Sequence, residues 1–222
     1  MPGAIEGPGR KGGPMSESAT SHVEPQGDAR VRLLAAATQS FASRGFHATT
    51  TRDISSAAGM SQAALYVHYP SKEDVLYLIC RTGLEELLSV MQEAGDGIAE
   101  PARRLSRIAR AFAVWHAQHT ALAKVANYEL SALAEEHWQV VRECRHRIEL
   151  CFREAIEDGM GQGAFEVANS HMTTFSIISM GTDIARWYRA DRTWTVEEVA
   201  DHYAAMVLRL VAGPTGGRAD GH

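Results

Sequence analysis

Residues 45–72 read GFHATTTRDISSAAGMSQAALYVHYPSK, and this stretch decides the fold. It contains two short segments with helical spacing of apolar residues, residues 50–58 and 62–68. Between them lie Gly59, which tolerates the positive φ of a tight turn, and Ser61, a preferred N-cap residue. The stretch therefore predicts two short helices joined by a tight turn, which is the arrangement of a helix-turn-helix.

The side chains of the two segments predict how they pack. Either Thr50 or Thr51 can cap the first helix, because threonine oxygen accepts from a free backbone N–H of the first turn. Ser55 is small enough to allow a close crossing. The apolar side chains expected between the two helices are Ile54, Ala57, Ala58, Met60 and Leu65.

Helical periodicity continues on both sides of this stretch. Apolar residues recur at helical spacing over residues 29–44, and Ser71 opens a long helical segment with Glu73 and Asp74 in its first turn, where the helix dipole favours acids. Further helices are predicted over residues 101–119, 121–134, 135–160, 169–188 and 196–211. Since alternation typical of strands is lacking, the sequence predicts an all-α chain of about nine helices.

Composition sets the broad class of the protein. The chain has 222 residues, of which 45% are hydrophobic and 22% charged, the mix of a globular protein. No run of 18 apolar residues occurs, so no membrane-spanning helix is expected. The three cysteines lack CxxC spacing and are expected to be buried thiols in a reducing cytoplasm. They are Cys80, Cys144 and Cys151.

The net charge of -5 hides an uneven distribution along the chain. Residues 29–75 carry five Lys or Arg against three Asp or Glu, whereas residues 76–222 carry 15 against 20. A mildly basic N-terminal module therefore precedes an acidic body. Such asymmetry favours a polyanionic partner for the basic part.

Four regions follow from these patterns. Residues 1–28 are rich in Gly, Pro and Ser and are expected to be a disordered tail, in which Met15 is an alternative start. Residues 29–75 form the helix-turn-helix domain and residues 76–212 the helical body. Residues 213–222 open with Gly-Pro and are expected to be a second tail.

The stretch GFHATTTRDISSAAGMSQAALYVHYPSKEDVL resembles the DNA-binding signature of the TetR family of bacterial repressors, and the resemblance covers residues 29–76. The departures are mild: Ser55 replaces the usual Ala, Met60 the usual Val and Tyr69 the usual Phe. Ala63 stands where many members carry Gly or a polar residue. The resemblance implies a homodimeric repressor that binds a palindromic DNA operator and is released by a small effector.

The resemblance also implies which residues contact DNA. The recognition helix is residues 62–68, beginning after Ser61, and Gln62 can pair with adenine N6 and N7. Ala63 and Ala64 can touch thymine methyl groups, and Arg52 can reach a base or a phosphate. The positions that match the family's phosphate contacts are Thr50 or Thr51, Tyr66, His68 and Lys72.

Other roles for these side chains remain open from the sequence alone. Tyr66 could pack in the small helical core, and His68 could be exposed without contacting DNA. Arg52 could pair with Asp53, and Lys72 could be an ordinary surface lysine.

The resemblance places an effector cavity and a dimer interface in the C-terminal body. Residues expected to line the cavity are Trp115, His119, Tyr128, Trp138, Phe152, Met172 and Phe175. Residues expected at the dimer interface are Ile184, Trp187, Tyr203, Met206 and Leu210. The alternative is that both sets belong to the core of one subunit, where aromatic side chains at helical spacing are more common.

The closing helices resemble the TetR branch that regulates steroid and fatty-acid breakdown in actinobacteria, whose effectors are acyl-CoA thioesters. The resemblance rests on the pair Trp187-Tyr188 before a short turn and the last helix. The basic residues Arg142, Arg145, Arg147 and Arg153 could meet the CoA phosphates, but glutamates alternate with them and favour a solvated mixed-charge face. Another hydrophobic or aromatic effector, or none, is the alternative.

Neither catalysis nor a metal is expected. The sequence contains no GxSxG, CxxC, HExxH, P-loop or dinucleotide-binding motif, so the enzyme hypothesis is weak and no cofactor is implied. His116 and His119 have i, i+3 spacing but no accompanying carboxylate motif, which favours ordinary histidines over a zinc site.

Overall fold

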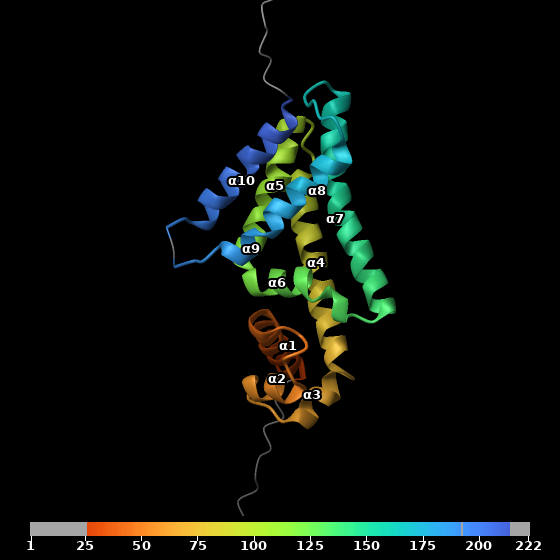
Figure 1. The fold of residues 1–222 in the computed structure, drawn as a ribbon, viewed down its shortest axis with the longest axis vertical. Helices are drawn as coiled ribbons and strands as arrows, with labels where there is room; N and C mark the ends of the chain where they lie inside the picture. The colour runs from red at the N-terminus through yellow and green to blue at the C-terminus, as the bar shows by residue number, and fades with distance from the viewer. Residues whose placement is uncertain (1–25, 192, 214–222) are drawn as a thin grey trace, which may run out of the picture.

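The computed structural model describes residues 26–191 and 193–213, and within these residues all regular structure is helical (Figure 1). The N-terminal helices are α1 (Gln26–Arg44), α2 (Thr51–Ala57) and α3 (Gln62–His68). The body contains α4 (Lys72–Gly95), α5 (Pro101–Gln118), α6 (Thr120–Tyr128), a 3-10 turn η1 (Leu130–Ala132), α7 (Glu135–Gly161), α8 (Ser170–Thr182), α9 (Ile184–Trp187) and α10 (Val196–Val211). The predicted all-α fold is confirmed.

Three predicted boundaries need correction. The helix predicted over residues 121–134 ends at Tyr128 and is followed by the 3-10 turn η1. Helix α1 begins at Gln26, so the last three residues of the predicted tail 1–28 are helical. The segment predicted as one helix over 169–188 is divided at Asp183 into α8 and α9. The remaining tail residues, 1–25 and 214–222, lie outside the described residues.

Helices α1 to α3 form a small domain, the reading head, around a core of large apolar side chains. Leu33, Phe41, Ile54 and Leu65 are almost completely buried there. The predicted turn is confirmed, because Gly59 has a φ of +69° and Ser61 Oγ accepts from the backbone of α3. At the start of α2, Thr50 and Asp53 form a reciprocal capping box.

The body surrounds α5, which packs against α4, α7 and α10. Phe112 on α5 is buried, with its ring 5.3 Å from that of Phe152 on α7 and 6.3 Å from that of Tyr203 on α10. Helix α4 runs from the reading head into the body, and α6 lies across the molecule next to α1 (Figure 1). The head and the body therefore meet at α4 and α6. None of the described helices has the length and apolar character needed to cross a membrane.

Candidate nucleic-acid interface and internal cavity

The outer face of α3 presents a connected set of polar side chains. Gln62 and Tyr66 are exposed, one turn apart on α3. Gln62 Nε2 donates a hydrogen bond to Thr51 Oγ1 at 2.9 Å, and the same oxygen lies 3.3 Å from the Tyr66 hydroxyl. Thr51, at the start of α2, thus holds both side chains toward the same surface. Tyr66 is 50% exposed, which excludes the alternative that it packs in the core.

The remaining residues predicted to contact DNA occupy two environments. Arg52, Ser61 and Ala63 are exposed, whereas Ala64 and His68 are partly buried. The Thr50 hydroxyl is occupied by its capping bonds with Asp53, and these hydrogen bonds lower the pKa of the Asp53 carboxyl.

Lys72 lies at the junction between the reading head and α4. Its Nζ donates to the backbone oxygens of Phe46 and Thr49, each at 2.8 Å, and lies 4.0 Å from the centroid of the Phe46 ring. Partial burial lowers the pKa of Lys72. The ammonium group therefore holds the turn between α1 and α2, and a third N–H remains for a partner outside these contacts.

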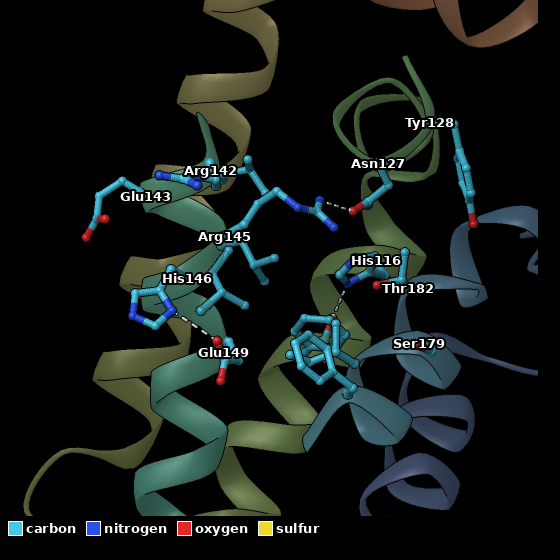
Figure 2. A pocket seen from close by; sticks show the side chains of 16 residues that line it. His116, Asn127, Tyr128, Arg142, Glu143, Arg145, His146, Glu149, Ser179 and Thr182 are labelled. Atoms are coloured by element: carbon cyan, nitrogen blue, oxygen red, sulfur yellow. Dashed lines mark hydrogen bonds and ion pairs between the residues drawn. The ribbon is translucent and has the colours of Figure 1, made fainter. Parts of the chain in front are cut away.

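A cavity of about 650 Å³ that opens to solvent lies in the body, with walls from α4 to α8 (Figure 2). Its buried wall combines the apolar side chains of Leu84, Leu87, Phe112 and Ile148 with the polar side chains of His116 and Glu149. Its exposed rim carries Arg142, Glu143, His146, Phe175 and Ser179. Small-molecule sites combine apolar side chains with polar groups that fix the orientation of the ligand, and this cavity offers both.

Only some of the residues predicted for the cavity line it. Tyr128 and Phe175 do so, each about half exposed. Trp115 and Phe152 are buried in the core, and His119 faces a separate hollow between α4 and α5. Trp138 packs against the core from α7, and Met172 is 68% exposed on α8. Helical spacing identified the apolar faces of these helices, but it does not say which neighbouring helix each face meets.

Several polar residues of the cavity wall were absent from the predicted lining, among them Asn127, Arg145 and Glu149. Arg145 NH1 donates to Asn127 Oδ1 at 2.8 Å, joining α7 to α6 (Figure 2). Glu149 is 7% exposed and is surrounded by His146 at 3.0 Å, Arg153 at 2.9 Å and His171 at 3.4 Å. The expectation of a solvated mixed-charge face is therefore wrong for Arg145 and Glu149. The available signal was the i, i+3, i+4 spacing of Arg145, Ile148 and Glu149, which places the two polar residues on the same face of α7 as the apolar Ile148.

His116 on α5 also lines the cavity and is only 1% exposed. Its Nδ1 lies 2.8 Å from the backbone oxygen of Phe112. Burial lowers the pKa of His116 to about 4, so the imidazole is neutral at physiological pH. Burial likewise lowers the pKa of the Arg145 guanidinium, which remains charged.

A second hollow of about 730 Å³ lies on the outside of the body, between the α8–α9 segment and α10. Large apolar side chains around it are exposed: Met180 by 37%, Trp187 by 44% and Trp194 by 59%. Of the residues predicted for the dimer interface, Trp187, Met206 and Leu210 retain exposed surface. Ile184 and Tyr203 are instead buried within the subunit, where the Tyr203 hydroxyl donates to the backbone oxygen of Ile177.

Glu73, Asp74 and His137 bring three possible metal-ligand atoms within 4.8 Å of one another. Each carboxylate already has protein partners. Glu73 accepts from the His137 ring at 2.8 Å and from Ala134 N at 2.9 Å, and Asp74 accepts from Ser71 Oγ at 2.6 Å. The cluster ties the start of α4 to the start of α7, which is sufficient reason for its geometry.

The chain matches known proteins over both the reading head and the body. Residues 33–77 match the family described as "Bacterial regulatory proteins, tetR family", and residues 99–211 match "Tetracyclin repressor-like, C-terminal domain". The HTH-type transcriptional repressor KstR2 of Rhodococcus jostii (strain RHA1) is 30% identical over 187 residues, which are 83% of this chain and 92% of the relative.

Two solved structures have the same fold. A bacterial regulatory protein in the tetR family from Rhodococcus RHA1 is 33% identical, with a TM-score of 0.79 over 83% of this chain and 97% of its own. AibR in complex with isovaleryl coenzyme A and operator DNA is 23% identical, with a TM-score of 0.74 over 81% of this chain and 97% of its own. The chain belongs to the TetR family of bacterial regulatory proteins and is a ligand-responsive, DNA-binding transcriptional regulator.

Proposed function

We propose that the protein is a homodimeric repressor that binds a palindromic operator through α3 and is released when an acyl-CoA thioester enters the 650 Å³ cavity. The observation that carries the proposal is the position of this cavity, whose wall includes α6, the helix that lies against the reading head. The repressor acts beside DNA in the cytoplasm and has no catalytic role. Another hydrophobic or aromatic effector is the alternative.

The lining of the cavity suits an amphipathic thioester. The buried apolar wall around Leu84, Leu87 and Phe112 can hold an acyl chain away from water. Arg142 at the exposed rim and Arg145 deeper in the wall can hold carbonyl or phosphate oxygens of the CoA portion. AibR, which shares the fold, was solved with such a thioester together with operator DNA.

A hydrogen bond links the cavity to the reading head. Asn127 and Tyr128 line the cavity, and the next residue, Glu129, accepts from the backbone N–H of Phe46 at 3.0 Å. Phe46 belongs to the same turn that Lys72 holds. A ligand that displaces the end of α6 would therefore move the turn that leads into α2. A ligand shifts an equilibrium only by the difference between its affinities for the two states. Release therefore requires the effector to bind more tightly to the state that does not bind DNA.

Replacing Glu129 with Ala is expected to reduce effector-dependent release, because the Phe46 N–H loses its acceptor on α6. The operator affinity measured without effector, divided by that with saturating decanoyl-CoA, should fall from about 5–150-fold in the wild type toward one. Glu129→Gln retains an acceptor oxygen and should keep most of the coupling. Calorimetry verifies that decanoyl-CoA still binds each variant. Full release in Glu129→Ala would exclude this link as the route of coupling.

Replacing Gln62 with Ala is expected to change sequence preference rather than general DNA affinity, because a glutamine amide reads adenine through two hydrogen bonds. Selection from a random duplex library should first yield a two-fold palindrome for the wild type. In the variant, preference at the affected base pair should weaken by about 1–3 kcal/mol. Gln139→Ala, an exposed glutamine on α7, serves as the control. Identical preferences in Gln62→Ala and the wild type would rule out base reading by Gln62.

The decisive test of the function is a titration of the selected operator complex with a panel of CoA thioesters, free fatty acids and aromatic compounds. The proposal expects acyl-CoA thioesters to bind the protein and to lower its operator affinity. Linkage requires the operator to lower thioester affinity by the same factor, which calorimetry can check. Release by another class, with no response to thioesters, would overturn the acyl-CoA assignment.

A further inference from the structure

The inner wall of the cavity contains a buried imidazole whose protonation state can be assigned. His116 Nδ1 lies 2.8 Å from the Phe112 backbone oxygen, and a carbonyl oxygen can only accept. The hydrogen of the neutral ring is therefore on Nδ1, which leaves Nε2 as an acceptor. Burial, aided by the positive charge of Arg145, keeps the pKa of His116 at about 4 and so preserves this acceptor at neutral pH.

The Nδ1 contact with Phe112 is the only hydrogen bond of His116 within residues 26–191 and 193–213, so Nε2 has no donor there. The ring lines the cavity although the residue is only 1% exposed, and Thr182 lines the same cavity (Figure 2). Because Nε2 faces the cavity, a ligand that covers it with carbon removes it from water and gives it no partner, which is unfavourable. A ligand that fills this space with a hydrogen-bond donor is thus favoured over one that fills it with carbon alone.

Arg145 provides the complementary group in the same cavity. Its guanidinium donates to the amide oxygen of Asn127 at 2.8 Å and lies 3.5 Å from the Ala126 backbone oxygen, both of which are neutral acceptors. The nearby carboxylate of Glu149 is already in contact with the side chains of His146, Arg153 and His171. A guanidinium has five N–H donors, so Arg145 can also donate to an oxygen of a ligand.

We propose that the cavity selects an acyl group that carries a hydroxyl, which donates to Nε2 of His116 while the carbonyl oxygen of the same ligand accepts from Arg145. This inference rests on the proposed acyl-CoA effector and specifies its chemistry. A saturated acyl thioester packs against the apolar wall and accepts from Arg145 through its carbonyl oxygen, but it offers no donor to Nε2 of His116. A hydroxyacyl thioester makes the same two contacts and also donates to His116 through its hydroxyl.

The experiment compares 3-hydroxydecanoyl-CoA with decanoyl-CoA, two thioesters of equal chain length, by calorimetry on the full-length protein. The wild type should bind the hydroxyacyl thioester about tenfold to a hundredfold more tightly, the range expected when a buried acceptor gains or lacks its donor. In His116→Phe, which keeps an aromatic ring without the ring nitrogens, this preference should disappear. His119→Phe, which changes a histidine outside the cavity, should retain it.

The outcomes separate this inference from the broader function. Equal affinity of the wild type for the two thioesters overturns the hydroxyl preference and leaves the acyl-CoA effector in place. A preference that persists in His116→Phe overturns the role of His116. If neither thioester binds, both the proposal of an acyl-CoA effector and the proposed hydroxyl preference are wrong. Because the first comparison uses the wild type alone, it remains decisive if His116→Phe does not fold. Arg145→Gln is then the second variant, and it should bind both thioesters with lower affinity than the wild type does.

Discussion

Replacing Trp187 with Asp is expected to make the protein monomeric and to lower its operator affinity by about a hundredfold or more. Trp187 is 44% exposed beside the outer hollow, where Met180 and Trp194 also expose apolar surface. Exposed apolar patches of this kind mark interfaces, and a charge buried there without a partner is strongly unfavourable. A dimer that engages both half-sites gains about 10²- to 10⁴-fold over one subunit, and the variant should lose this gain.

Analytical ultracentrifugation gives the oligomeric state, and a fluorescence assay on the selected operator gives the affinity. Val140→Asp places the same charge at a 40% exposed valine on α7, outside the hollow, and should remain a dimer. Ile184→Asp would be an unsuitable variant, because Ile184 is 2% exposed inside the subunit and its loss would unfold the chain. A Trp187→Asp protein that still sediments as a dimer would place the interface elsewhere.

The second large effect is expected for Lys72→Ala, which should weaken binding to every DNA sequence alike. The variant removes the two hydrogen bonds that hold the Phe46 and Thr49 carbonyls, so the turn that presents α2 loosens. Charged hydrogen bonds of this type contribute about 1.5–3 kcal/mol each when buried. Because Lys72 is only partly buried, we expect the free energy of unfolding to fall by about 1–2 kcal/mol in total.

The salt dependence of binding separates the two roles of Lys72. If its third N–H contacts a phosphate, the slope of log K against log salt should fall by about one in Lys72→Ala. We expect both this change and the loss of stability, measured by urea unfolding. Arg81→Ala removes an exposed charge of the same sign on α4, paired with Glu85, and should change neither. An unchanged salt slope together with lowered stability would restrict Lys72 to holding the turn.

The features that the sequence predicted correctly are local ones. Gly59 and Ser61 were identified because a positive φ and an N-cap depend on residues a few positions apart. The periodic apolar residues likewise predicted the helices, because the buried face of a helix appears in the sequence as apolar residues spaced three or four positions apart. The exceptions were at boundaries: α1 begins at Gln26, α6 ends at Tyr128, and the break at Asp183 follows Gly181, a glycine that the prediction placed inside one continuous helix.

The composition of the cavity depends on contacts between helices far apart in the chain. Trp115 and His116 are neighbours in sequence, yet His116 lines the cavity whereas Trp115 does not. The choice is made by the packing of α5 among α4, α7 and α10, which rotates one face toward the cavity. Arg145 becomes part of the wall for a similar reason, because α6 brings Asn127 to its guanidinium.

The sequence by itself thus determined the helical fold, the reading head and the family, because caps, turns and periodic burial are encoded over a few turns of chain. Only the tertiary structure decided which polar groups share the cavity and which apolar groups remain exposed. Ile184 and Trp187 show the difference, since they lie one turn apart on α9 but one is buried in the subunit and the other is 44% exposed. The physical reason is that a helix presents several faces, and the elements packed around it determine which of them meets solvent, a ligand or a partner.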